Sequence, residues 1–439
     1  MLRDADSDAA AVSLPRLRSA DSQALGLRAS GGSASPFWRR WLVSLSSEDR
    51  AALGIWATAH VALLVLAWAA AWAFRPAREH APLTGRFEQW DAYLLRNIAQ
   101  YGYFGAHSIH NNAAFFPGYP IVLAAAHLVV RNWVLAELLV PAVAGCFAVV
   151  SLARLAGGRR AVLYLVTAPA AIFLLVGYAE TLFLALAVPA WLAARQGRWP
   201  RAALLAGLAG LVRPDALFLI PALAVMALTG SYQRGQLTGP GSQPDPVRPA
   251  DAAGHASLGG EPIRARVRDA WWMRLVNALI AGTALAGPAA YELYLRLHTG
   301  SWMAWSHALQ AGWDLHLSTP AQALRTTWWA AFRHPFSAST AFEFQLELGA
   351  MAAIALAAVA FAAWRRWPEA VYCGLAVVAL GTSTWYQTAP RTLLVLFPVW
   401  IALARIGDRW PGVRYVYLAI SAPIAVVLGM LYLSGLWAG

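Results

Sequence analysis

The sequence has 439 residues, of which 59% are hydrophobic and only 13% are charged. A soluble domain carries about a quarter charged residues, so this composition, with a mean hydropathy of +0.49, excludes an ordinary soluble protein. The net charge is +12 and the chain contains no lysine. We attribute the charge to membrane topology and not to nucleic-acid binding, because the arginines gather in short loops beside apolar runs.

Residues 1–50 are polar, with no hydrophobic stretch ahead of a small-residue cleavage site. We predict a disordered cytoplasmic tail here, with Phe37–Leu45 as an interfacial anchor, and no cleavable signal peptide. Residues 230–272 are rich in Gly, Pro, Ser and scattered charge, which predicts a disordered cytoplasmic loop. This loop separates N-terminal membrane helices in 51–229 from C-terminal ones in 273–439.

The apolar runs predict an all-α polytopic membrane protein with about eleven transmembrane helices, since a crossing needs about 20 residues. The longer runs are Leu53–Phe74, Val134–Leu155, Ala161–Tyr178, Leu275–Leu297, Leu346–Trp364, Ala370–Tyr386 and Tyr415–Trp437. The shorter runs are Leu182–Ala194, Ala202–Val212, Ala216–Thr229 and Leu393–Ala404. Cys146 and Cys373 lie inside such runs and are interpreted as core residues, not as a disulfide or a metal pair.

The distribution of arginine assigns the two longest connections to the extracytoplasmic side. These are residues 75–114, of which the part Arg75–Asn112 forms the loop proper, and residues 299–345. The arginines at 159–160, 195–201, 365–366 and 405–414 are then cytoplasmic. This scheme requires that Tyr119–Val130 does not cross the membrane fully, as a re-entrant or interfacial helix.

The first outer loop carries a carboxylate beside aromatic residues, in Trp90–Asp91. A charge at the membrane boundary is costly unless it is paired or used, and Asp91 is placed to accept a proton as a general base. The alternative interpretation is a solvated aspartate in a belt of interfacial aromatic residues.

Three further charged groups, Glu180, Arg213 and Asp215, lie at the predicted outer ends of apolar runs. An arginine there suits a phosphate, because its planar head donates several hydrogen bonds. The alternative is an internal Glu180–Arg213 ion pair that holds the helices together. We expect Asp91, Glu180 and Arg213 to converge on one outward-facing cavity, since isolated charges at this depth are expensive.

Six blocks of sequence resemble, in order, the PIG-V family, the mannosyltransferases that add the second mannose of GPI anchors, and their bacterial relatives. The blocks span roughly 90–398 and read WDAYLLRNIAQYGY, AAFFPGYP, GYAETLFLAL, GRWPRAALLAGLAGLVRPDAL, LHTGSWMAWSHALQAGW and APRTLLVLFP. Single blocks are weak signals, whereas six in the same order are specific.

The resemblance implies a GT-C class glycosyltransferase, a multi-helix membrane enzyme that inverts the anomeric centre at the outer face. It implies a polyprenyl-phosphate sugar as the donor, with mannose as the sugar. We assign no cofactor and no metal ligand from the sequence, which does not determine whether a metal is required. By the motifs, Asp91 is the catalytic base and Arg391 a ligand of the donor phosphate. The remaining motif positions, implied to bind substrate, are Trp90, Glu180, Arg213, His307, Gln310 and Trp313.

The chain departs from the family pattern at Gly118, Ala179, Thr181 and Thr392. These departures leave the acceptor open among a cell-envelope glycolipid, a glycan and a protein side chain. A rival interpretation is a transporter or a flippase for lipid-linked sugars, which shares the helices and the intramembrane charges. Against it, we find no internal repeat, and the acidic residue lies in a loop. A catalytically inactive scaffold is the third interpretation.

Overall fold

The computed structural model describes residues 44–73, 83–231, 263–333 and 336–436. Across these ranges the regular structure is helical, and the extended pairing is an isolated antiparallel bridge between Leu317 and Ser383. The all-α class predicted from the sequence is confirmed for this part of the chain. Most of the predicted tail 1–50, most of the predicted loop 230–272 and residues 74–82 of the first loop lie outside the described residues.

Five helical segments are long and apolar enough to cross a membrane. Each contains the roughly 20 apolar residues that a 30 Å hydrocarbon layer requires. They are α2 (Ser47–Ala73), α5 (Trp133–Ala156), the segment Trp271–Thr299, α16 (Ala338–Ala363) and α20 (Pro411–Leu433). The segment Trp271–Thr299 combines the end of α12 (Ile263–Gly282) with η4 (Thr283–Leu285) and α13 (Ala286–Thr299). These lengths and compositions define a multi-pass membrane protein.

Several apolar helices are shorter. They are α4 (Gly118–Val130), α8 (Glu180–Arg195), α9 (Trp199–Val212), α10 (Ala216–Thr229) and α17 (Trp367–Gly381). With 13 residues, α4 reaches about 20 Å, which is consistent with the expectation that this segment does not cross fully. The number of crossings, expected to be about eleven from run lengths, stays a prediction.

Two apolar runs that predict continuous helices are broken at prolines. The run Ala161–Tyr178 forms α6 (Arg160–Val166) and α7 (Ile172–Leu175), with Pro169 between them. The run Leu393–Ala404 is divided between α18 (Ala389–Val395) and α19 (Phe397–Arg409), which meet at 73°. Proline lacks the backbone N–H that an unbroken helix needs, and Pro398 at the start of α19 ends the first helix of that pair.

Three helices begin inside segments that the sequence analysis assigned to the tail or to loops. Helix α2 begins at Ser47, inside the predicted tail 1–50. Helix α12 begins at Ile263, inside the predicted loop 230–272, because the stretch after Pro262 contains neither glycine nor proline to interrupt it. Helix α16 begins at Ala338, inside the predicted loop 299–345, where the Ser337 side chain accepts a hydrogen bond from Thr340 N as a cap.

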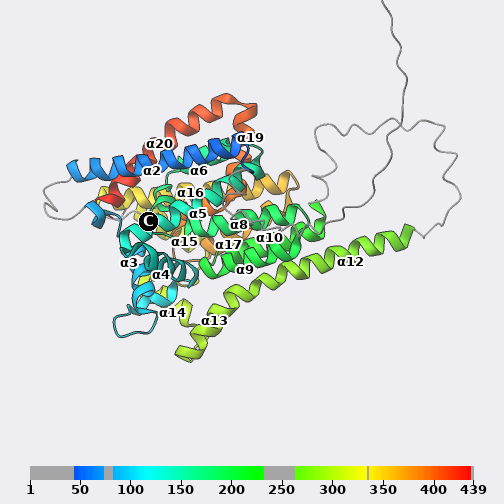
Figure 1. Cartoon of the computed structure of the whole chain (residues 1–439), viewed down its shortest axis with the longest axis horizontal. Helices are drawn as coiled ribbons and strands as arrows, with labels where there is room; N and C mark the ends of the chain where they lie inside the picture. Colours follow the sequence, from blue (N-terminus) through cyan, green and yellow to red (C-terminus); the bar gives the residue numbers. More distant parts are fainter. Residues whose placement is uncertain (1–43, 74–82, 232–262, 334–335, 437–439) are drawn as a thin grey trace, which may run out of the picture. The chain divides into compact units, whose positions relative to one another are not determined.

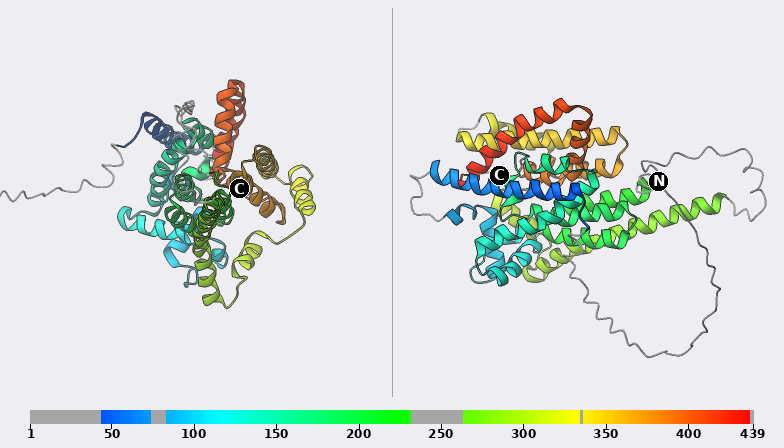
Figure 2. Two further views of the ribbon diagram at one scale, coloured as in Figure 1. Left: turned by 90° about the vertical axis from the view of Figure 1, so that its right-hand side faces the viewer. Right: turned by 45° about the horizontal axis from the view of Figure 1, so that its top comes forward.

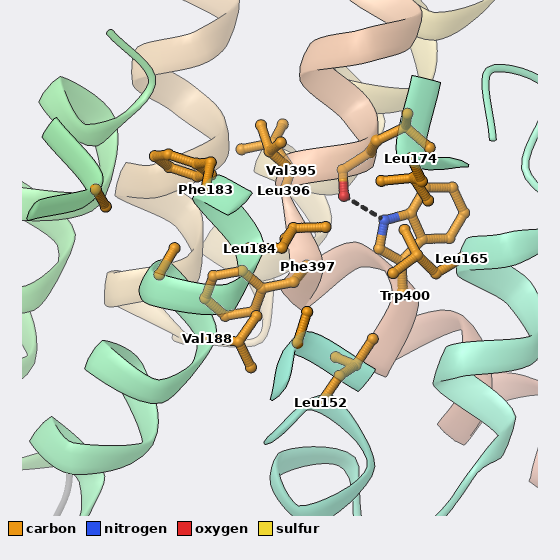
Figure 3. Close-up of a cluster of buried hydrophobic side chains, with 14 of the residues drawn as sticks. Leu152, Leu165, Leu174, Phe183, Leu184, Val188, Val395, Leu396, Phe397 and Trp400 are labelled. Atoms are coloured by element: carbon orange, nitrogen blue, oxygen red, sulfur yellow. Dashed lines mark hydrogen bonds between the residues drawn. The ribbon is translucent and has the colours of Figure 1, made fainter. Parts of the chain in front are cut away.

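The core is made by close packing of helices distant in sequence. Figure 3 shows Leu152 of α5, Phe183 of α8 and Phe397 of α19 in one cluster, where Trp400 Nε1 donates to Leu394 O at 3.0 Å. Helices α2 and α20 lie side by side, although they come from the two ends of the membrane region (Figure 1, Figure 2). In the bent α18–α19 pair, α18 packs on α8 and α19 packs mainly on α6.

The two long loops form short helices that pack on each other. The first contains η2 (Leu83–Arg86), α3 (Asp91–Tyr101) and η3 (His110–Ala114), and the second contains α14 (Ala304–Trp313) and α15 (Pro320–Phe332). Three successive carbonyls of the first loop accept hydrogen bonds from aromatic side chains. The pairs are Tyr291 Oη to Ala113 O at 2.9 Å, Trp305 Nε1 to Ala114 O at 3.2 Å and Tyr103 Oη to Phe115 O at 2.9 Å.

Burial raises the pKa of Tyr103 above its ordinary range, so its phenol stays protonated as the donor of the last of these bonds. The bonds tie α13 and α14 to the segment that leads into α4, because a donor from each helix is used. The position of the first loop thus depends on the C-terminal helices.

Candidate active site

Four of the predicted site residues meet in one network of ion pairs. Arg391 Nη1 lies 2.6 Å from Asp91 Oδ2, and Arg391 Nε lies 2.6 Å from Glu180 Oε1. Arg213 Nη1 lies 2.6 Å from the same Glu180 oxygen, and Arg213 Nε lies 2.8 Å from Asp215 Oδ2. The fold therefore brings side chains from four separate elements into one continuous network. Carboxylates and guanidinium groups alternate along it.

Each charged group stands at or near the end of a helix. Asp91 and Glu180 are the first residues of α3 and α8, where the positive end of the helix dipole favours a carboxylate. Arg213 follows the last residue of α9 and has an extended backbone. Arg391 lies in the first turn of α18, the short helix before the 73° bend. The ends of these short or broken helices thus lie close together, and so do the charged side chains at them.

Burial within the network follows a gradient. The Glu180 side chain is 0% exposed, those of Arg391 and Arg213 are 8% and 10% exposed, and that of Asp91 is 14% exposed. Asp91 is therefore the outermost of these four. A solvated belt aspartate, the alternative interpretation of Asp91, does not fit a side chain that is paired and largely buried.

Aromatic side chains enclose the Asp91 end of the network. The Arg391 guanidinium lies 4.7 Å from the Tyr178 ring centroid and 5.1 Å from that of Phe173, within the range of cation–π contacts. Asp91 N donates to Tyr178 Oη at 3.3 Å. Tyr432 Oη donates to Phe87 O at 2.9 Å, which fixes the chain just before the site.

Trp90 has an unusual backbone, with φ of 52° and ψ of −117°. A residue other than glycine rarely adopts a positive φ, and such strain costs about 1–3 kcal/mol. The indole Nε1 donates to Leu436 O at 3.3 Å. Trp90 thus has a strained conformation next to Asp91. Residues with such strain are found most often at functional sites.

The three residues predicted from the second loop lie elsewhere. His307, Gln310 and Trp313 belong to α14, which packs on η3 and α13. The His307 and Gln310 side chains are exposed, and the Trp313 ring meets that of Phe115 edge-on at 5.6 Å. Among the described residues, no hydrogen bond or ion pair joins these three to the network around Asp91.

Glu347 is a residue of the site that the motifs did not indicate. Its two carboxylate oxygens accept hydrogen bonds from Thr388 N at 3.0 Å and from Ala389 N at 2.8 Å. It therefore caps α18 from the neighbouring α16 and holds the helix that carries Arg391. The signal available in the sequence was a second charge in FEFQLEL, at the edge of an apolar run where charge is costly.

Within the described ranges, no group of three or more His, Cys, Asp or Glu residues is arranged to hold a metal ion. The charged groups of the network around Asp91 are carboxylates and guanidinium groups. A carboxylate at the rim can accept a proton, and a guanidinium can stabilise a phosphate oxygen.

Comparisons with known proteins add little to this picture. No family model matches the chain, and no curated protein matches it. Among solved structures it is similar to the oligosaccharyltransferase of Archaeoglobus fulgidus in its apo form, with 16% identity and a TM-score of 0.36. The similarity covers 87% of this chain and 56% of the other, so the chain spans about half the length of that protein. A TM-score this low does not establish a shared fold.

Proposed function

We propose that this protein is an inverting membrane glycosyltransferase that moves a sugar, mannose, from a polyprenyl phosphate to an extracytoplasmic acceptor. The observation that carries the proposal is the contact of 2.6 Å between Asp91 and Arg391. It joins a candidate base and a candidate phosphate ligand from the first and last of the blocks that resemble the PIG-V family. Both groups would lie within reach of one bound sugar phosphate.

In the proposed reaction, the acceptor hydroxyl oxygen attacks the anomeric carbon. The bond between that carbon and the phosphate oxygen breaks, and the polyprenyl phosphate leaves with the electron pair. Asp91 takes the proton of the hydroxyl as the new bond forms. Arg391 stabilises the charge that grows on the departing phosphate, because a guanidinium forms strong charge-assisted bonds to phosphate oxygens.

The surroundings of α18 support a lipid-linked donor. A cavity of about 680 Å³, lined mainly by apolar side chains of α16, α18, α19 and α20, borders this helix. Pro390 and Leu393, which flank Arg391 in the sequence, are among its lining residues. An isoprenoid chain lying in this cavity would bring its phosphate toward Arg391.

The test is transfer from labelled polyprenyl-phosphate-mannose by membranes that contain the wild type or Asp91→Asn. The substitution keeps the size of the side chain but removes its basicity. General-base catalysis contributes about 10²–10⁴-fold, so we expect turnover to fall by about that factor while binding of the donor is largely retained.

The matched control is Asp314→Asn, which changes an aspartate whose side chain is 83% exposed and should leave transfer unchanged. Full activity of Asp91→Asn would remove the catalytic assignment. Absence of transfer by the wild type, with any mannose donor and membrane extract, would favour the transporter or scaffold interpretation instead.

A further inference from the structure

A polar pocket, separate from the network around Asp91, lies at the end of α8 opposite to Glu180. Its volume is about 160 Å³, and α8, α10 and the turn between α16 and α17 enclose it. A smaller cavity shares four of its lining residues and extends it toward α19. The 16 residues of α8 put this pocket about 24 Å from the network around Asp91.

Four arginines are among the residues that line the two cavities. Arg195, Arg365 and Arg366 line the larger cavity, and Arg405 lines the smaller one. Glu369 lines both cavities, and its carboxylate pairs with Arg366 at 2.7 Å. In the described part of the chain, Arg195, Arg365 and Arg405 have no carboxylate within ion-pair distance. Four cations thus converge on one carboxylate.

Arg365 occupies a position that favours glycine. Its φ is 56°, in the left-handed region, at the turn that ends α16. This conformation costs a residue with a side chain about 1–2 kcal/mol. Two further arginines without a carboxylate partner among the described residues, Arg195 and Arg405, line the same two cavities.

The pocket lies at the level of a membrane surface. The turn between α16 and α17 directly follows a candidate membrane span. Trp364 and Trp367, on either side of Arg365 and Arg366, are 53% and 48% exposed. Exposed tryptophans at the end of a span are typical of the boundary between hydrocarbon and headgroups. The phosphates nearest to the pocket are therefore those of lipid headgroups.

We propose that this pocket, defined by Arg195, Arg365, Arg366 and Arg405, binds the phosphate of an anionic phospholipid headgroup. Arginine offers a planar fork of donors that matches phosphate oxygens, and basic pockets between membrane helices bind such headgroups. Bound lipid would tie α8, α17 and α19 together on the side of the protein away from Asp91. The proposal is independent of the transferase reaction.

The experiment measures thermal unfolding of the full-length protein in a nonionic detergent, titrated with phosphatidylglycerol. Phosphatidylcholine serves as the lipid without net charge, and inorganic phosphate as the soluble anion. A ligand that binds the folded state raises the unfolding temperature with its concentration. We expect phosphatidylglycerol to raise it, and the other two additives to have no effect at equal concentration.

Arg195→Gln/Arg405→Gln should weaken the apparent affinity for phosphatidylglycerol about 30-fold. Arg195→Lys/Arg405→Lys keeps the charge but loses the fork, and its affinity should lie between those of the glutamine variant and the wild type. The matched control is Arg198→Gln/Arg201→Gln, which removes the same charge from residues that do not line either cavity. Its affinity should change by less than about threefold.

Three outcomes would overturn the proposal. Equal effects of phosphatidylglycerol and phosphatidylcholine would show that the headgroup charge is not recognised. Equal stabilisation by inorganic phosphate would identify a site for a soluble anion. Equal losses in the two glutamine variants would show that diffuse surface charge, and not the pocket, attracts the lipid. None of these readouts depends on whether the protein transfers sugar.

Discussion

Replacing Glu180 by glutamine removes the charge that two buried arginines share. One Glu180 oxygen accepts from both Arg213 Nη1 and Arg391 Nε, each at 2.6 Å, and the side chain is fully buried. Each arginine keeps a second carboxylate, Asp215 or Asp91. The loss should therefore be smaller than the roughly 3–5 kcal/mol that follows when a buried charge is left with no partner.

The magnitude follows from the two bonds. A hydrogen bond to a charged group contributes about 1.5–3 kcal/mol and a neutral one about 0.5–1.5 kcal/mol. In Glu180→Gln, both hydrogen bonds change from a charged acceptor to a neutral one. This change should lower the free energy of unfolding by about 2–3 kcal/mol. Asp91→Asn weakens one bond at a partly exposed side chain and should cost about 1 kcal/mol.

The assay is equilibrium unfolding of both variants by denaturant in mixed micelles, followed by tryptophan fluorescence, together with transfer activity per folded molecule. We expect Glu180→Gln to lose mainly stability and Asp91→Asn to lose mainly turnover. Stability of Glu180→Gln within about 0.5 kcal/mol of the wild type, the usual effect of a surface substitution, would refute the assignment of Glu180 as the shared acceptor. A larger stability loss in Asp91→Asn than in Glu180→Gln would contradict the burial gradient.

Two further predictions concern packing and topology. Gly145→Ala should cost about 1–3 kcal/mol, because a Cβ there would overlap the Trp56 ring; Gly54→Ala, with open space around it, should be neutral or stabilising, and equal effects of both would contradict the packing of α2 on α5. In a cysteine-free background, Leu317→Cys should react with an impermeant thiol reagent from outside intact cells, whereas Ser242→Cys in the loop 230–272 should not. The opposite labelling would invert the predicted topology.

Much of this protein follows from its sequence alone. The apolar runs mark the positions of the long helices because length and hydrophobicity are local properties. The cost of charge near a membrane singles out Asp91, Glu180 and Arg213, and the last motif block adds Arg391. The structure joins these four in one network of ion pairs. The outward-facing cavity expected around the first three stays a prediction.

The tertiary structure alone decided how those charges are paired. The Glu180–Arg213 pair that the sequence offered as an alternative is present at 2.6 Å. The sequence did not indicate the bridge from Glu180 through Arg391 to Asp91, which joins residues 300 positions apart. Such a contact depends on the 73° bend between α18 and α19 and on the cap that Glu347 provides. Local patterns carry no information about which helix ends meet, because the packing of distant helices sets that geometry. For the same reason, His307 and Gln310 match a motif and yet lie on a helix that packs elsewhere.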